Sequence, residues 1–207
     1  MSESGKPEAS GVIAATAMFI EVLVVGIGAF AALVGCVSAV AGYSNMQKVA
    51  PILASTPVSG AALAFSYALG IAIDRAADFL LTPHRRRLRS RYFSSNVAYS
   101  LARRTVADSP HIAAMADYAR SRMRICRGWV LNSLLLSVAF ILLISRFPVQ
   151  DRALLIAATA VMGGLFVVGF YAAWMNITVT GYKKLSQQTS DIQANVPSQG
   201  SGVTAST

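Results

Sequence analysis

The chain has 207 residues, of which 55% are hydrophobic and 13% are charged, and its net charge is +9. An ordinary soluble domain contains about 25% charged residues, so this composition excludes one. Four stretches contain no Asp, Glu, Lys or Arg, and each is close to or above the ~20 residues that cross a bilayer. They are residues 22–47, 49–73, 128–145 and 153–182. The sequence therefore predicts an all-α membrane protein with four transmembrane helices in two antiparallel pairs.

Five segments are predicted along the chain. Both ends are polar and lack the apolar content of a packed core, so we expect them to be disordered. A basic segment separates two pairs of transmembrane helices. In order, the segments are the N-terminal tail 1–10, the transmembrane helices of 11–82, the basic helical segment 83–127, the transmembrane helices of 128–184 and the C-terminal tail 185–207.

Prolines set the expected ends of the first helices. The first transmembrane helix is predicted from about Gly11 to Gly42, followed by a turn over residues 43–48. The second is predicted from about Pro51 to Leu81, with Pro57 bending or restarting it. Pro83 is expected to end it, because proline cannot continue the backbone hydrogen bonds of a helix.

The second half of the chain offers clearer helix signals. Ser94 or Ser95 is placed to cap a short helix that runs to about Ala107. A long helix is predicted to begin near Pro110, a favoured residue at a first helical position, and to enter the membrane directly. After a tight loop over residues 146–152, the last helix is predicted from about residue 153 to beyond Trp174.

The distribution of Lys and Arg predicts the orientation. Eleven arginines lie between Arg85 and Arg127, and short basic segments stay on the cytosolic side of a membrane. With four spans, both termini are then cytosolic as well. Only Lys48, Arg146 and Arg152 face outward in this arrangement. We expect the protein in the plasma (inner) membrane.

Charged residues are predicted to gather at the inner membrane edge. At 1.5 Å per residue, Glu21 lies about 31 Å from the outer end of its helix and Asp74 about 34 Å from that of the next. Arg75 is therefore the expected partner of Glu21, with Asp78 one turn further along. The functional interpretation is a charged gate at the cytosolic mouth of a pore. The structural alternative is an ion pair that fixes the register of two helices.

The basic segment is predicted to form a small helical cytosolic cap with an arginine-rich surface. Anionic lipid headgroups are its expected partner. A phosphate or nucleotide site and a cytosolic protein partner are the alternatives that we consider. Nucleic acid is disfavoured, since no aromatic residues alternate with the basic ones. The surface consists of Arg85, Arg86, Arg87, Arg89, Arg91, Arg120, Arg124 and Arg127.

Small residues recur at helical spacing in the first two transmembrane helices. Such rows let helices approach closely, which drives association in lipid. They indicate either a homo-oligomer or close packing of these two helices on each other. The residues concerned are Gly28, Ala32 and Gly35 in the first helix and Gly60, Ala64, Ala68 and Ala72 in the second.

No catalytic, cofactor-binding or metal-binding motif is found. Asp74 and Asp78 are a pair of carboxylates, but Arg75 lies between them and no third carboxylate is near in sequence. We therefore expect a non-enzymatic, self-assembling membrane protein that acts as a channel or permeability effector and is gated from its basic cytosolic face. The alternative is a membrane anchor or scaffold that recruits a cytosolic partner through residues 84–127.

Overall fold

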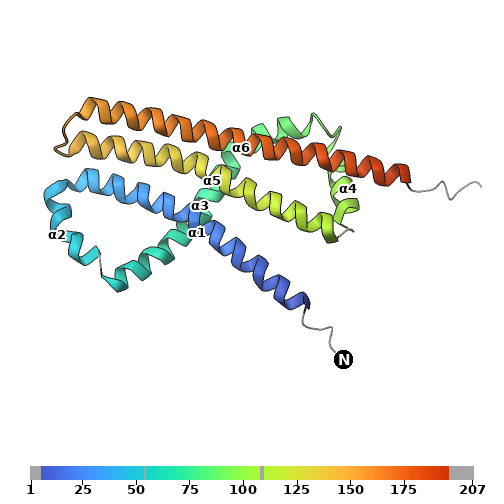
Figure 1. The fold of residues 1–207 in the computed structure, drawn as a ribbon, viewed down its shortest axis with the longest axis horizontal. Helices are drawn as coiled ribbons and strands as arrows, with labels where there is room; N and C mark the ends of the chain where they lie inside the picture. The colour runs from blue at the N-terminus through green and yellow to red at the C-terminus, as the bar shows by residue number, and fades with distance from the viewer. Residues whose placement is uncertain (1–5, 54, 108–109, 196–207) are drawn as a thin grey trace, which may run out of the picture. The chain divides into compact units, whose positions relative to one another are not determined.

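The structure is a computed structural model that describes residues 6–53, 55–107 and 110–195. Within these ranges it is all-helical, as the composition predicts (Figure 1). The helices are α1 (Lys6–Ala41), α2 (Tyr43–Leu53), α3 (Thr56–Arg89), α4 (Asn96–Ala107), α5 (Pro110–Arg146) and α6 (Arg152–Asn195).

Four helices are long and apolar enough to cross a membrane. The segments that meet this criterion are Ala15–Ala41 of α1, all of α3, Met115–Arg146 of α5 and Arg152–Ser190 of α6. The four spans predicted from the uncharged stretches are confirmed at this level, and the chain has the character of a multi-pass membrane protein. The uninterrupted helix from Pro110 into the third span is also confirmed.

Two predictions about helix ends are wrong, whereas the restart at Pro57 agrees with the sequence prediction. The predicted turn over 43–48 is the start of α2, which contains Pro51. Helix α3 restarts at Thr56, with Pro57 in its first turn, where a missing N–H is tolerated. The expectation that Pro83 ends this helix is wrong, since α3 continues to Arg89. Proline removes one backbone hydrogen bond, and neighbouring turns here carry the helix past that gap.

Helical structure also extends into both segments predicted as tails. Helix α1 begins at Lys6 and α6 continues to Asn195. No proline or glycine lies between Gly181 and Asn195, so nothing in the local sequence stops the last helix. The remaining parts of the predicted tails, 1–5 and 196–207, lie outside the described residues.

The chain divides into two compact units, and α3, α5 and α6 each contribute to both. Unit 1 comprises residues 1–82 and 121–175, and unit 2 comprises residues 83–120 and 176–207. The boundary on α3 falls at Pro83.

In unit 1, α1, α5 and α6 lie side by side (Figure 1). Gly35 of α1 contacts Ala139 of α5, and Gly163 of α6 contacts Ser137 of α5. The rings of Trp129 and Phe170 stack between α5 and α6 at 5.7 Å. Small residues bring the helix backbones close in this unit, and most large aliphatic side chains of α6 remain exposed, as suits a lipid-facing helix.

A loop of five residues joins α5 to α6. Asp151 has φ of 52°, a conformation that an Asp adopts more readily than most residues. The Arg152 guanidinium donates to the carbonyl of Phe147 at 3.1 Å. This bond closes the loop.

Unit 2 is organised around a short capped helix and an aromatic cluster. The backbone N–H of Ala98 donates to Ser95 Oγ at 3.0 Å, which confirms the predicted cap of α4. Tyr182 of α6 packs against the rings of Phe93 and Tyr99 at 6.4 and 5.9 Å. These edge-on ring contacts hold α4 against the last part of α6.

Candidate functional site

Helices α1 and α3 cross with their backbones in contact. Gly26 of α1 faces Ser66 and Gly70 of α3, and Gly70 faces Val22 of α1. A Cβ atom at either glycine would overlap a backbone atom of the opposite helix. Glycine is therefore required at both positions. Each of the two helices carries charged side chains about one turn from the crossing. These side chains are within reach of α5.

Arg127 of α5 binds two carboxylates of α3. Its Nη2 and Nε donate to Asp74 Oδ1 at 2.7 and 3.2 Å, and its Nη1 donates to Asp78 Oδ1. The two aspartates lie one turn apart, so a single planar guanidinium spans both. Only 14% of the Arg127 side chain is exposed. The arrangement is a largely buried ion pair that ties α3 to α5.

Glu21 of α1 contacts α5 through a hydroxyl group. Ser121 Oγ donates to Glu21 Oε1. The other carboxylate oxygen, Oε2, is buried and has no hydrogen-bond partner among the described residues. A buried polar atom without a partner costs free energy. The contact of Glu21 with α5 therefore has fewer hydrogen bonds than the contact of Arg127 with α3.

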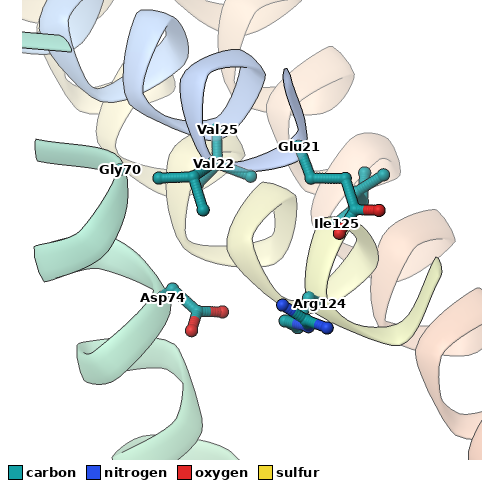
Figure 2. A pocket seen from close by; sticks show the side chains of 7 residues that line it. All are labelled: Glu21, Val22, Val25, Gly70, Asp74, Arg124 and Ile125. Carbon is teal, nitrogen blue, oxygen red and sulfur yellow. The ribbon is translucent and has the colours of Figure 1, made fainter. Parts of the chain in front are cut away.

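A small pocket lies between the three helices. It contains about 230 Å³ of space free of protein atoms, open solvent included, and has room for little more than a water molecule. Figure 2 shows the carboxylates of Asp74 and Glu21 directed toward α5, where Arg124 lies. Both signs of charge therefore line this pocket, together with the apolar residues Val22, Val25, Gly70 and Ile125.

Arg75 is not part of this charged cluster. It is exposed on α3, and within the described part of the chain no carboxylate forms an ion pair with it. The expected partner of Glu21 is therefore replaced by Ser121. Arg75 follows Asp74 by one residue, which turns it about 100° around the helix and away from the face that meets α5.

The eight arginines of the predicted basic surface differ in exposure. Arg127 is shielded, whereas Arg120 is exposed and pairs with Asp117 on its own helix. The sequence prediction had placed both on one basic surface. Apart from Arg127, the exposed members are Arg86, Arg87, Arg91 and Arg120, and the partly buried ones are Arg85, Arg89 and Arg124.

The small residues predicted for helix packing form two groups. On α1, Gly28 contacts Asn132 and Trp129 of α5, and Ala32 is buried; like Gly35, they lie at the α5 side. The row on α3 is exposed, and a Cβ added at Gly60 would meet nothing within 4 Å. The α3 row is Gly60, Ala64, Ala68 and Ala72.

Asn132 of α5 is a buried polar residue. Its side chain is fully buried, and its Nδ2 donates to the carbonyl of Val25 at 2.6 Å. Its Oδ1 is buried with no hydrogen-bond partner in the described part of the chain. Asn132 therefore acts as a polar contact between α1 and α5.

A metal site in the described residues would need several ligating side chains close together. No group of three or more His, Cys, Asp or Glu among them is arranged to hold a metal ion. What the charged cluster does chemically is to bind helices together through hydrogen bonds and opposite charges. Comparison with protein families, curated proteins and solved structures finds no match to this chain.

Proposed function

We propose that this chain is a non-enzymatic membrane protein that assembles with copies of itself and acts as a channel or permeability effector, gated from its basic cytosolic face. The observation that carries this proposal is the exposed row of small residues on α3. We place the protein in the plasma (inner) membrane with both termini cytosolic, its spans in two antiparallel pairs and unit 2 as a helical cap.

The α3 row supports self-association because the chain itself leaves it uncovered. Helix α3 crosses α1 through Ser66 and Gly70, not through Ala64, Ala68 or their row. This favours self-association over packing of the first two spans on each other as the explanation of the row. Small side chains at intervals of four let a second helix approach closely in lipid. A copy of α3 is the natural occupant.

The polar residues of the spans favour a path between copies over a path within one chain. Ser66, Asn132 and Ser133 are buried, and Asn132 contributes to helix packing. The conduction path we propose is therefore narrow, lies between copies and passes the charged cluster. Helix α5 connects the basic cytosolic face to the charged cluster, because it carries exposed Arg120 and shielded Arg127 on one continuous helix.

The proposal is tested first by the mass of the complex. We expect native mass spectrometry of the purified chain in nanodiscs to show an assembly of four or more copies. Ala68→Leu places a large side chain in the α3 row and is expected to break this assembly. Ala158→Leu, at an exposed position of α6, makes the same change elsewhere and is the matched control. A monomeric wild type overturns the proposal.

Conduction is tested separately. Planar bilayer recordings of the wild type should show discrete current steps, and neutralising Glu21 and Asp74 together should change their ion preference. A wild type that assembles normally but never conducts would retain self-assembly and reject the channel.

The orientation can be tested by labelling introduced cysteines in a chain in which Cys36 and Cys126 are replaced by Ala. Ser190→Cys is expected to react with a membrane-impermeant reagent only after cells are opened, and Gln150→Cys in intact cells. The reverse pattern would invert the proposed topology.

A membrane scaffold is the second candidate, and the exposed arginines of unit 2 favour it. Arg86, Arg87 and Arg91 are exposed, so they are accessible to an acidic cytosolic partner. Replacing residues 84–127 with a neutral linker would damage α5, so charge removal is the better test. If the chain is a scaffold, Gln at these three positions should release a bound partner. If it is a gated channel, the same change should abolish regulation of the current. The number of assembled copies should stay unchanged in both cases.

A further inference from the structure

Helix α4 has an uncovered face that is both apolar and basic. Val97 and Leu101 lie one turn apart, with 74% and 54% of their surface exposed. Arg104 follows on the same side and is exposed as well. The opposite side of the helix is packed, with Ala102 and Val106 buried. Two large aliphatic side chains are thus turned outward beside an arginine on a helix of 12 residues.

Contacts within unit 2 fix which way this face points. The Arg89 guanidinium lies 5.2 Å from the centre of the Tyr99 ring, and its Nη2 donates to Asn96 Oδ1 at 2.7 Å. The Tyr99 ring in turn packs on Tyr182. Helix α4 is therefore held on its inner side and at its N-terminus, and it cannot bury Val97 by rotating without breaking these contacts.

The depth of α4 relative to a bilayer follows from counting along α6. Tyr182 lies about 30 residues after Arg152, or about 45 Å along one continuous helix. A bilayer including its headgroups is about 40–45 Å thick. A helix that enters at Arg152 on one side therefore brings Tyr182 to the headgroups of the other. Because Tyr99 packs on Tyr182, α4 lies at that level too.

Unit 2 also carries exposed positive charge on α4 and on the part of α6 that packs against it. Arg103 and Arg104 of α4 are exposed, and so are Lys183 and Lys184 of α6. Amphipathic helices with aliphatic residues on one side and arginines beside them bind at the boundary between headgroups and acyl chains. Guanidinium groups match the geometry of phosphate. A leaflet rich in anionic lipid complements this surface in both charge and polarity.

We propose that α4 docks on the headgroup layer of the membrane that the chain spans. Val97 and Leu101 insert between lipids, and Arg103 and Arg104 bind phosphates of anionic lipids. This inference depends on the chain crossing a membrane, and it holds whether or not the chain assembles or conducts.

The test uses the full chain in nanodiscs. Val97→Cys, in a chain with Cys36→Ala and Cys126→Ala, carries an environment-sensitive fluorophore. In discs with phosphatidylglycerol we expect blue-shifted emission and quenching by lipids that carry a shallow spin label. In discs of phosphatidylcholine alone the docked fraction should fall. Arg103→Gln with Arg104→Gln should lower the docked-to-undocked ratio about 25-fold, at about fivefold per arginine.

Controls separate this result from a general loss of charge or fold. Arg146→Gln with Arg152→Gln removes the same charge at the other end of α5 and α6 and should leave the ratio unchanged. Equal intrinsic tryptophan fluorescence on heating shows that the variants stay folded. Water exposure of position 97 in anionic discs overturns the proposal. So does shielding that occurs only in native vesicles and is lost in discs, since a protein would then cover α4.

Discussion

Arg127 and Arg120 lie two turns apart on α5 and have different surroundings. The first is 14% exposed and binds two aspartates of another helix, whereas the second is 48% exposed and pairs with Asp117 of its own helix. Helix α3 shows the same contrast between Gly70, which meets a backbone, and Gly60, which meets nothing. The same residue type fixes the fold in one place and remains available to an external partner in the other.

The largest effect is expected from breaking the buried ion pair. Arg127→Gln leaves Asp74 and Asp78 without their counter-charge, which should lower the free energy of unfolding by about 3–5 kcal/mol. Reversible denaturation in mixed detergent micelles measures it. Adding Asp74→Asn and Asp78→Asn to this variant removes the unpaired charges and should restore much of the loss. If the free energy of unfolding of Arg127→Gln alone stays within about 1 kcal/mol of the wild type, the ion pair contributes little to stability.

A side chain at the helix crossing should have the next largest effect. Gly70→Val forces α1 and α3 apart and should cost about 1–3 kcal/mol or more. Gly60→Val is the matched change in open space on the same helix, where we expect no more than about 0.5 kcal/mol in a monomeric micelle preparation. Equal losses at the two positions would remove the distinction between the two faces of α3.

Asn132 should have a smaller effect. Asn132→Ala removes its bond to the Val25 carbonyl, and hydrogen bonds between membrane helices contribute about 0.6–1.7 kcal/mol. The same denaturation experiment measures this loss. Asn132→Leu also removes the unpartnered Oδ1 and fills the space, so it should be less damaging than Ala. If Leu is the worse of the two, steric fit outweighs polarity at this contact.

Arg120 should matter least to stability. Arg120→Gln removes an exposed ion pair with Asp117, and such pairs contribute about 0–1 kcal/mol. High salt should erase the small difference from wild type, because it screens exposed charges. A loss as large as that of Arg127→Gln would show that Arg120 and Arg127 contribute equally to stability.

The sequence predicts the spans well because their signal is local. An uncharged stretch as long as a bilayer is thick is recognised from its own residues, without knowing which helices pack against it. The continuous α5 likewise follows from the lack of a break after Pro110. The cap at Ser95 is local as well. Pro83 shows the limit of such reasoning, since whether a proline ends or only interrupts a helix depends on the turns around it.

The pairing of charges was not predictable in the same way. Arg127 is 53 residues from Asp74, and the partner of a residue depends on how two helices are rotated about their axes. The sequence prediction grouped Arg127 with Arg120 and Arg124 in one basic surface. One signal was present, however: Arg127 directly precedes the uncharged stretch that begins at 128. Among the arginines of this basic segment, the one next to the span lies nearest the hydrocarbon and gains most from a counter-charge.

The five-residue loop between α5 and α6 has a consequence for biosynthesis. A loop this short keeps the adjoining ends of two long apolar helices together, with Arg152 bonded to Phe147. We therefore expect α5 and α6 to insert into the bilayer as one hairpin after α6 has been synthesised.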